Sequence, residues 1–246
     1  MPFERCGKML VATDQAEMAR MAALYDRCQA NGIAVERIEA AELARREPHI
    51  SGLGALYVSA SGIVDYGAVA RRMAALVAER GGTILTDTEM RAVSEEPSSI
   101  TLDAGGRVIR ARHLIACAGV MADRIAAMCG LELDFCIVPF RGEYFRLGDE
   151  KDDIVRHLIY PFPDPALPFL GVHLTRMIGG YVTVGPNAVL AFARNGYRFG
   201  DVSLRDVKEM IAYRGFRRVV RANLRSGFDE MRNSLSKRRY LQLCRR

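Results

Sequence analysis

The sequence predicts an α+β fold in which helices flank a mixed, mostly antiparallel sheet. Half of the 246 residues are hydrophobic, so the chain can bury a sizeable core. Short strand-like runs joined by glycine pairs, at Gly105-Gly106 and Gly179-Gly180, are typical of antiparallel hairpins. Residues that start and stop helices, such as Asp14 and Asn31-Gly32, separate other apolar runs. Together these features indicate strands and helices packed around one or two cores.

The individual elements follow from the spacing of apolar residues and from the capping residues beside them. Asp14, with Glu17 three residues later, matches a capping box, and the helix after Asp65 has an apolar face that includes Met73 and Val77. The expected helices span 14–30, 40–46, 65–80, 121–128 and, in two or three pieces, 203–246. The expected strands span 6–13, 83–86, 90–94, 100–102, 107–109, 113–117, 137–147, 158–161, 169–176 and 181–184.

Several motifs that identify enzyme classes are absent from the sequence. No strand is followed by GxGxxG, and the nearest candidate, Gly52-Leu53-Gly54, is typical of a turn. The patterns of zinc proteases, serine hydrolases, P-loops and calcium loops are absent too. The six cysteines form no CxxC pair, which predicts reduced, buried thiols rather than a metal site or a disulfide framework. No run of eighteen apolar residues occurs.

The positive charge of the chain is concentrated in one segment. Residues 214–246 contain eleven Lys and Arg against two acidic residues, a net charge of +9. Because the whole chain carries +6, the preceding residues carry −3. Such a segment is typical of contact with an anionic membrane, nucleic acid or an acidic partner, although a solvated helical face has the same composition. Its few aromatic residues, and the lack of a recognised binding motif, argue against nucleic acid.

A strand-to-helix segment at 114–123 is a candidate ligand site. The small residues Ala116 to Gly119 would let a ligand approach the backbone, and the N-terminus of the following helix attracts anions. Tight packing of the strand on the helix explains the same residues. The spacing alone leaves both interpretations open.

A predicted hairpin at 171–187 carries the candidate catalytic residues. Strand alternation places His173 and Thr175 on one face, and Leu174 and Arg176 on the other. A neutral imidazole suits a general base near neutral pH. The fork of an arginine side chain suits a substrate carboxylate. A structural histidine and a strand-end surface arginine are the alternatives.

Two other strands supply candidate substrate contacts. In the run 139–145, Arg141 and Glu143 share one face, where they would either form a surface ladder or meet a substrate. Tyr144 faces the opposite side and would line a cavity. Tyr160 precedes a proline-rich loop and would lie at a cavity mouth or in the core.

Five strings, in order along nearly the whole chain, resemble one family. They are CGKMLVAT at 6–13, SGIV at 61–64, PFRGEYF at 139–145, GVHLTR at 171–176 and GPNAVLAF at 185–192. These strings are similar to those of the L-2-hydroxyglutarate dehydrogenase/oxidase family, within the D-amino-acid-oxidase-like flavoproteins. The resemblance implies FAD-dependent oxidation of L-2-hydroxyglutarate to 2-oxoglutarate, with hydride passing from C2 to flavin N5. It also implies that electrons then pass to the respiratory chain through a quinone.

The resemblance also suggests roles for individual residues. Arg176 is expected to hold a substrate carboxylate, and His173 is our hypothesis for the base that takes the hydroxyl proton. The other expected substrate contacts are Arg141, Tyr144 and Tyr160. The expected flavin contacts are Met90, Ala118, Gly119, Ala122 and Asp123.

Members of this family open with GxGxxG and continue beyond the position of Arg246, so the resemblance implies a chain truncated at both ends. We expect 65–130 to be remnants of an FAD-binding Rossmann-like domain that lacks its GxGxxG opening. Residues 1–64 and 131–202 are expected to form mainly the substrate-domain sheet, and 203–246 a basic helical tail. A catalytically inactive domain that binds a dicarboxylate or a partner protein is the alternative function. We expect a cytoplasmic protein, with peripheral contact at the inner face of the cell membrane.

Overall fold

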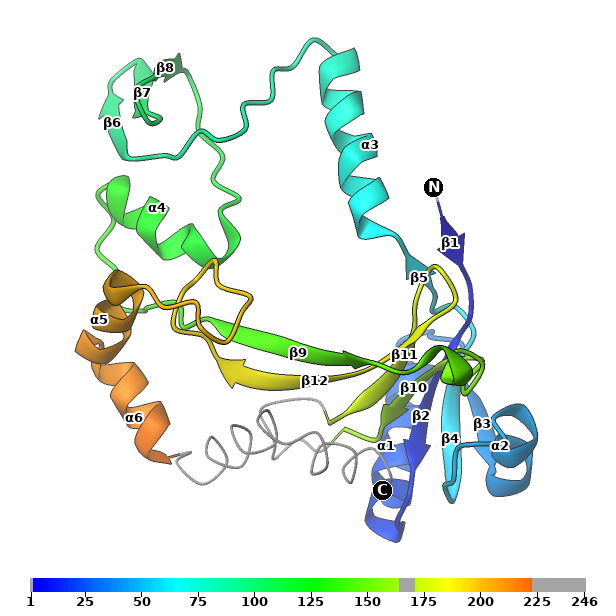
Figure 1. The fold of residues 1–246 in the computed structure, drawn as a ribbon. Helices are drawn as coiled ribbons and strands as arrows, with labels where there is room; N and C mark the ends of the chain where they lie inside the picture. The colour runs from blue at the N-terminus through cyan, green and yellow to red at the C-terminus, as the bar shows by residue number, and fades with distance from the viewer. Residues whose placement is uncertain (1, 164–170, 223–246) are drawn as a thin grey trace. The chain divides into compact units, whose positions relative to one another are not determined.

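The computed structural model describes residues 2–163 and 171–222, which fall into two compact units (Figure 1). Among the described residues, the first unit comprises 2–76 and 142–188, and the second comprises 77–141 and 189–222. The chain therefore enters and leaves each unit more than once. The boundaries of the units differ from the predicted domain limits. The predicted assignment of segments to cofactor and substrate parts stays a prediction.

A mixed seven-stranded sheet dominates the first unit and confirms the predicted fold class. Its strand order is β3-β4-β2-β10-β11-β12-β9. Strands β2 and β10 run parallel, whereas the pairs β3–β4, β4–β2, β10–β11 and β11–β12 are antiparallel. The strands span β2 Lys8–Ala12, β3 Glu36–Glu39, β4 Gly54–Val58, β9 Phe140–Arg146, β10 Leu158–Pro161, β11 His173–Arg176 and β12 Val182–Leu190. A separate two-stranded ribbon joins β1 (Phe3–Glu4) to β5 (Ile63–Val64).

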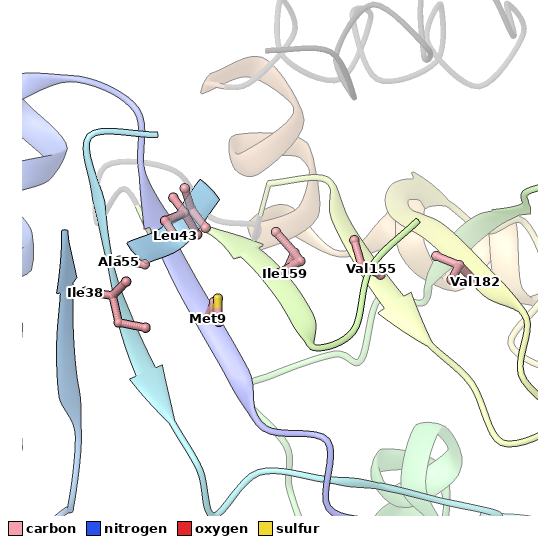
Figure 2. Close-up of a cluster of buried hydrophobic side chains, with 8 residues drawn as sticks. Met9, Ile38, Leu43, Ala55, Val155, Ile159 and Val182 are labelled. Atoms are coloured by element: carbon pink, nitrogen blue, oxygen red, sulfur yellow. The ribbon is translucent and has the colours of Figure 1, made fainter. Parts of the chain in front are cut away.

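Two apolar clusters pack on opposite faces of this sheet. One contains Met9, Ile159 and Val182 from the sheet and Leu43 from helix α2 (Ala40–Arg46), as Figure 2 shows. The other packs Leu10, Ala12 and Leu56 of the sheet, with Phe162 just after β10, against helix α1 (Gln15–Ala30) through Met18, Met21 and Leu24. Strand alternation explains the division, because neighbouring residues such as Met9 and Leu10 point to opposite faces. The sheet is thus covered by α1 on one face and by α2 on the other.

The first helix confirms the predicted capping pattern. Asp14 Oδ1 accepts a hydrogen bond from the backbone N–H of Glu17, and Glu17 Oε2 accepts in return from the backbone N–H of Thr13. At the other end, the chain leaves α1 through Asn31 and through Gly32, which has φ +65°. These contacts satisfy backbone groups that a helix end leaves without partners. The helix limits could therefore be predicted to within one residue.

A buried carboxylate ties the end of α2 to the start of β10. Glu47 has 0% exposure and accepts hydrogen bonds from the backbone N–H groups of Arg156 and His157. Its Oε1 also lies 2.5 Å from Nδ1 of His157. A buried carboxylate requires such partners, because an unpaired one costs several kcal/mol. This contact fixes the two residues that immediately precede β10.

The second unit contains a small hairpin sheet and four helical segments. Its strands are β6 (Ala92–Glu96), β7 (Ser99–Asp103) and β8 (Val108–Ala111), all antiparallel. Gly105 and Gly106, with φ of +66° and +95°, form the predicted turn between β7 and β8. The helical segments are η1 Gly119–Met121, α4 Ala122–Met128, α5 Leu204–Ala212 and α6 Arg214–Ala222. The predicted C-terminal helix therefore breaks at Tyr213, and its part beyond Ala222 lies outside the described residues.

Two predicted strands of the second unit are wrong. Residues 83–86 and 113–117 have no regular secondary structure, and Ile115 in the second segment is 86% exposed. An apolar run forms a strand only when a neighbouring strand satisfies its backbone N–H and C=O groups. Within the described residues neither segment has such a neighbour. Apolar composition alone could not show this.

Helix α3 (Tyr66–Glu79) forms where it was predicted, but its apolar face is not buried. Asp65 Oδ1 accepts from the backbone N–H of Ala68, which confirms the expected cap. None of the helix residues is buried, and Met73 is 62% exposed. Among the helices of the described ranges, none has the length and apolarity that crossing a bilayer requires.

The contact of Glu47 predicts a large loss of stability on truncation. Glu47→Ala should lower the free energy of unfolding by roughly 2–4 kcal/mol, because it leaves buried N–H donors without an acceptor. Glu42→Ala on the same helix removes surface ion pairs to Arg45 and Arg46, and should cost much less. Urea denaturation of both variants measures the difference. Equal losses would show that the Glu47 contact does not hold the sheet together.

Candidate functional site

Side chains from three adjacent strands form a polar row on one face of the first unit's sheet. Strand β10 lies between β2 and β11, and its Ile159 is paired with Met9 on one side and with Leu174 on the other. These three apolar residues belong to the cluster on the α2 face. Alternation therefore places Lys8, Tyr160 and His173 together on the opposite face. We call these three side chains the polar row.

The rings of Tyr160 and His173 stack at the centre of the polar row. Their centroids are 4.0 Å apart and their planes differ by 12°. Tyr144 of β9 approaches His173 edge-on, with centroids 6.5 Å apart. The structure thus brings together one predicted catalytic residue and two predicted substrate contacts. His173 itself is buried.

A glycine permits the close approach of Tyr144. Gly185 of β12 is the register partner of His173 and has φ +151°. A Cβ atom at this position would lie 2.7 Å from the carbonyl oxygen of Glu143 and 2.9 Å from the ring of Tyr144. Both the backbone conformation and the space therefore require glycine here. The glycine in GPNAVLAF has a structural reason that could not be inferred from the string alone.

The environment of His173 defines its tautomer and lowers its pKa. Nδ1 lies 3.2 Å from the carbonyl oxygen of Gly171, which can only accept, so the proton of the neutral ring is on Nδ1. Nε2 then carries the lone pair, as a general base requires. Burial lowers the pKa of His173, the hydrogen bond to the Gly171 carbonyl opposes this in part, and the positive charge of Lys8 adds a smaller lowering of the pKa. The imidazole is therefore neutral at physiological pH.

Tyr160 and Thr175 add hydroxyl groups beside the imidazole. Burial raises the pKa of Tyr160, so its hydroxyl keeps its proton, and it shares a hydrogen bond with the Thr175 side chain. Thr175 lies on the same face as His173, two residues further along β11. This face therefore offers one proton acceptor, Nε2 of His173, and two hydroxyl groups.

Arg176 lies on the opposite face of the sheet from His173. It is the register partner of Val182, which belongs to the apolar cluster on the α2 face. Its Nε lies 3.1 Å from a carboxylate oxygen of Glu4, so its charge already has a partner within the chain. The predicted alternation along β11 is confirmed. A substrate contact by Arg176 stays a prediction, and the structure does not bring this residue to the polar row.

Arg141, another predicted substrate contact, lies in the second unit. Its guanidinium donates to the backbone carbonyl of Arg198, 2.7 Å away, within the same unit. Its role toward a substrate stays a prediction. The burial pattern of β9 alternates residue by residue, which agrees with the predicted opposition of Tyr144 to Arg141 and Glu143.

The predicted flavin contacts lie in the second unit, and one of them belongs to a buried ion network. Both carboxylate oxygens of Asp123 accept hydrogen bonds from the guanidinium of Arg194, and Arg194 is only 7% exposed. Asp123 also accepts from the backbone N–H groups of Arg124 and Ile137. The hydrogen bond from Arg194 holds the pKa of Asp123 at about 2, far below the usual value of an aspartate. The carboxylate is therefore ionised and engaged by the protein itself.

The same network joins α4 to α5. Arg124 pairs with Asp206 and with Glu209, and Asp206 also accepts from the backbone N–H of Arg194. Removing one partner of such a buried set leaves an uncompensated charge, which is strongly destabilising. The network thus explains the position of Asp123 by the stability of the second unit. A contact between Asp123 and a cofactor stays a prediction.

Comparisons with known proteins identify the family. The sequence profile described as "FAD dependent oxidoreductase" matches residues 1–235. The chain belongs to the FAD dependent oxidoreductase family. The resemblance inferred from the five strings is thereby confirmed at the level of the family.

Two relatives from distant organisms carry the name L-2-hydroxyglutarate dehydrogenase. The chain is 53% identical over 245 residues to the L-2-hydroxyglutarate dehydrogenase of Escherichia coli K12, covering 99% of this chain and 58% of that protein. It is 38% identical over 242 residues to the mitochondrial L-2-hydroxyglutarate dehydrogenase of Homo sapiens, covering 93% of this chain and 52% of that protein. The chain therefore spans little more than half the length of these relatives.

Solved structures of FAD dependent oxidoreductases share the fold. The glycine oxidase of Geobacillus kaustophilus matches with a TM-score of 0.67 and 20% identity, over 86% of this chain and 54% of that one. L-alpha-glycerophosphate oxidase from Mycoplasma pneumoniae, a structure with FAD bound, matches with a TM-score of 0.72 and 20% identity, over 84% and 56%. Because both structures are only 20% identical to this chain, their similarity establishes the fold and no shared function.

The described residues do not by themselves enclose a site for FAD. The sequence has no GxGxxG to cradle the pyrophosphate. At Gly119, with φ +52°, an added Cβ would meet no atom within 4 Å, so the space beside this residue is open. Ala122 is exposed, Met90 and Ala118 are partly exposed, and Asp123 is occupied by Arg194. The chemistry assigned to this chain is therefore limited to what its own side chains do.

Sequence reasoning missed Lys8, the third member of the polar row. Its Nζ lies 5.3 Å from the centroid of the Tyr160 ring. Strands β3 and β4 were missed as well; at β4 the first residue, Gly54, was assigned to a turn with Gly52 and Leu53. Lysine at the start of an apolar strand has the pattern of a surface residue. Only the parallel pairing of β2 with β10 reveals what it faces.

The tautomer and burial of His173 predict its titration. In an NMR titration of the whole chain, the ring of His173 should titrate below about 6.5, the ordinary value for histidine. Because the unfolded chain then binds the proton more readily, this group should make folding less favourable as the pH falls below about 6.5. His173→Gln assigns the signal and should weaken that acid dependence. A midpoint above 6.5 would contradict the buried neutral imidazole.

Proposed function

We propose that this chain is the substrate-binding part of an enzyme that oxidises L-2-hydroxyglutarate to 2-oxoglutarate, with FAD as electron acceptor. The observation that carries this proposal is the 53% identity, over 99% of the chain, to an enzyme named L-2-hydroxyglutarate dehydrogenase. Membership of the FAD dependent oxidoreductase family supports the cofactor. FAD supplies the redox chemistry, and the chain supplies substrate binding and proton transfer.

Within this proposal, His173 is the base. Oxidation of a 2-hydroxy acid releases the hydroxyl proton, and Nε2 of His173 is the acceptor that the Gly171 contact leaves available. The stack with Tyr160 and the edge of Tyr144 hold the ring in one orientation. The two tyrosines therefore position the base. Arg176 and Arg141 remain predicted substrate contacts, although neither belongs to the polar row.

We also propose that the two units have different functions. The first unit carries the polar row and would bind the substrate, while the second carries the predicted flavin contacts near Met90 and 118–123. The second unit has exposed apolar side chains, including Ile84, Leu85 and Ile115. The competing function is a catalytically inactive domain that binds a dicarboxylate or a partner protein, and exposed apolar surface favours its partner-binding form. A test must therefore separate binding from turnover.

A chimeric enzyme tests the proposed reaction. This chain replaces the matching 245-residue stretch of the Escherichia coli K12 relative, which supplies the rest of its own sequence. The chimera should reduce its flavin when L-2-hydroxyglutarate is added without another electron acceptor, and the D enantiomer should not. His173→Gln in the chimera should lower kcat by about 10²-fold or more, because the proton acceptor is lost. Flavin absorbance in a stopped-flow instrument measures both.

The outcomes separate the alternatives. A chimera that binds FAD and does not react with L-2-hydroxyglutarate would refute the proposed reaction for this chain. Binding of the dicarboxylate without flavin reduction would favour the inactive binding domain. An unchanged rate in His173→Gln would remove His173 as the base while leaving the reaction intact.

We also propose that the basic segment 214–246 contacts an anionic membrane surface, where a quinone would accept electrons. In α6, the described part of this segment, four arginines at i, i+3, i+4 and i+7 share one helical face: Arg214, Arg217, Arg218 and Arg221. A basic face with apolar residues opposite suits a helix at a lipid surface. This would place a cytoplasmic enzyme at the inner face of the cell membrane.

Vesicle sedimentation tests the membrane proposal. The whole chain should sediment with vesicles that contain phosphatidylserine, should remain in solution with neutral vesicles, and should be released by salt. Arg217→Ala with Arg221→Ala should weaken the binding. Removing two basic residues elsewhere, through Arg71→Ala with Arg72→Ala on α3, is the matched control and should have little effect. Equal sedimentation with neutral lipid would end the proposal.

A further inference from the structure

We propose that Lys8 binds the second carboxylate of the substrate and makes the site specific for dicarboxylates. This inference rests on the proposed function, because it names the feature of the substrate that the polar row recognises. It concerns a residue that lies in the string CGKMLVAT but to which the sequence analysis assigned no role.

The position of Lys8 follows from the order of the strands. Lys8 begins β2, which pairs in parallel with β10, and β11 lies on the other side of β10. Tyr160 of β10 therefore lies between Lys8 and His173. Its ring is 5.3 Å from Nζ of Lys8 and 4.0 Å from the centroid of the His173 ring. The cation and the base flank one aromatic ring on the same face of the sheet.

Lys8 differs from the other candidate cations in having no carboxylate partner. Within the described residues, none of the ion pairs includes Lys8, whereas Arg176 is paired with Glu4 and Arg194 with Asp123. Its side chain is also only partly exposed. A partly buried ammonium without an anion loses hydration without gaining a partner, which favours binding of an anion supplied by a ligand. Among these three cations, Lys8 is the one whose charge is available.

Hydroxyl groups complete the proposed anion site. Tyr160 and Thr175 share one hydrogen bond, so one hydroxyl donates to the other and the second hydrogen is available for a ligand. A carboxylate near Lys8 would accept from the ammonium and from that hydroxyl. Hydrogen bonds to charged groups contribute about 1.5–3 kcal/mol each, enough to decide between similar ligands.

The separation of Lys8 from His173 determines which carboxylate is bound. Strands β2 and β11 are two strand spacings apart, about 10 Å. In a 2-hydroxy acid, the hydroxyl at C2 is adjacent to the C1 carboxylate, so that pair cannot span the Tyr160 ring. A five-carbon diacid can, with its hydroxyl at Nε2 of His173 and its distal carboxylate at Lys8. The polar row would therefore favour substrates whose second carboxylate lies several carbon atoms away from the C2 hydroxyl group.

The test compares a dicarboxylate with a monocarboxylate on the purified whole chain. Glutarate and butyrate are the probes, because neither can be oxidised at C2 and neither binding measurement needs FAD. By calorimetry the wild type should bind glutarate roughly tenfold or more tightly than butyrate, the size of one charge-assisted contact. Lys8→Met should abolish the preference, and Lys8→Arg should retain most of it.

Controls separate a local effect from loss of folding. Lys151→Met, at an exposed lysine of η2 (Asp149–Lys151), should leave the preference unchanged. Circular dichroism should show Lys8→Met to be folded. The Lys8→Arg variant, which keeps the charge, distinguishes recognition from packing. A wild type without preference for glutarate, or a Lys8→Met variant that keeps it, would overturn the proposal.

This experiment can fail independently of the proposed function. If the chimera oxidises L-2-hydroxyglutarate and its Lys8→Met variant has the same KM, the reaction stands and the role of Lys8 falls. If the chain binds glutarate through Lys8 and the chimera does not oxidise the hydroxy acid, the specificity site stands without the reaction.

Discussion

The pairing of β10 with β2 on one side and with β11 on the other is the interaction on which the rest of the first unit depends. It joins strands from two distant parts of the sequence into one sheet, and it places Tyr160 between Lys8 and His173. The Glu47 carboxylate binds the two residues just before β10 and so fixes where that strand begins. Ile159 then packs in the apolar cluster below, while the polar row occupies the face above. The apolar cluster on the α2 face and the polar row thus lie on opposite faces of the same three strands.

The local structure of this chain could be predicted well, because its signals lie within a few residues of one another. The capping box at Asp14, the glycine turn at 105–106 and the limits of 40–46 each depend on neighbouring residues alone. The wrong elements, 83–86 and 113–117, depend on a distant partner strand that an apolar run cannot specify. Strand β3, with the sequence Glu-Arg-Ile-Glu, was missed because it buries only Ile38.

The candidate site was predictable in part for the same reason. Alternation along β11 correctly separated His173 from Arg176, since both lie on one strand. The stack of His173 on Tyr160, and the position of Lys8, depend on strand order across the sheet and could not be predicted. Asp123 shows the opposite difficulty. The family resemblance suggested a flavin contact at Asp123, whereas its oxygens bind Arg194, more than seventy residues away in the sequence.

The parallel pair β2–β10 has a consequence for how the protein reaches its native state. Leu158 pairs with Lys8, about 150 positions earlier, so this contact closes a very long loop. We expect local hairpins such as β11–β12 to form early and contacts of such separation to form late, because closing a long loop costs chain entropy. During synthesis, the edge of β2 that later pairs with β10 has no partner strand until β10 has been synthesised. An exposed strand edge is a template for association between chains. Slow synthesis, or arrest before Leu158, would therefore leave exposed the edge of β2 that later pairs with β10.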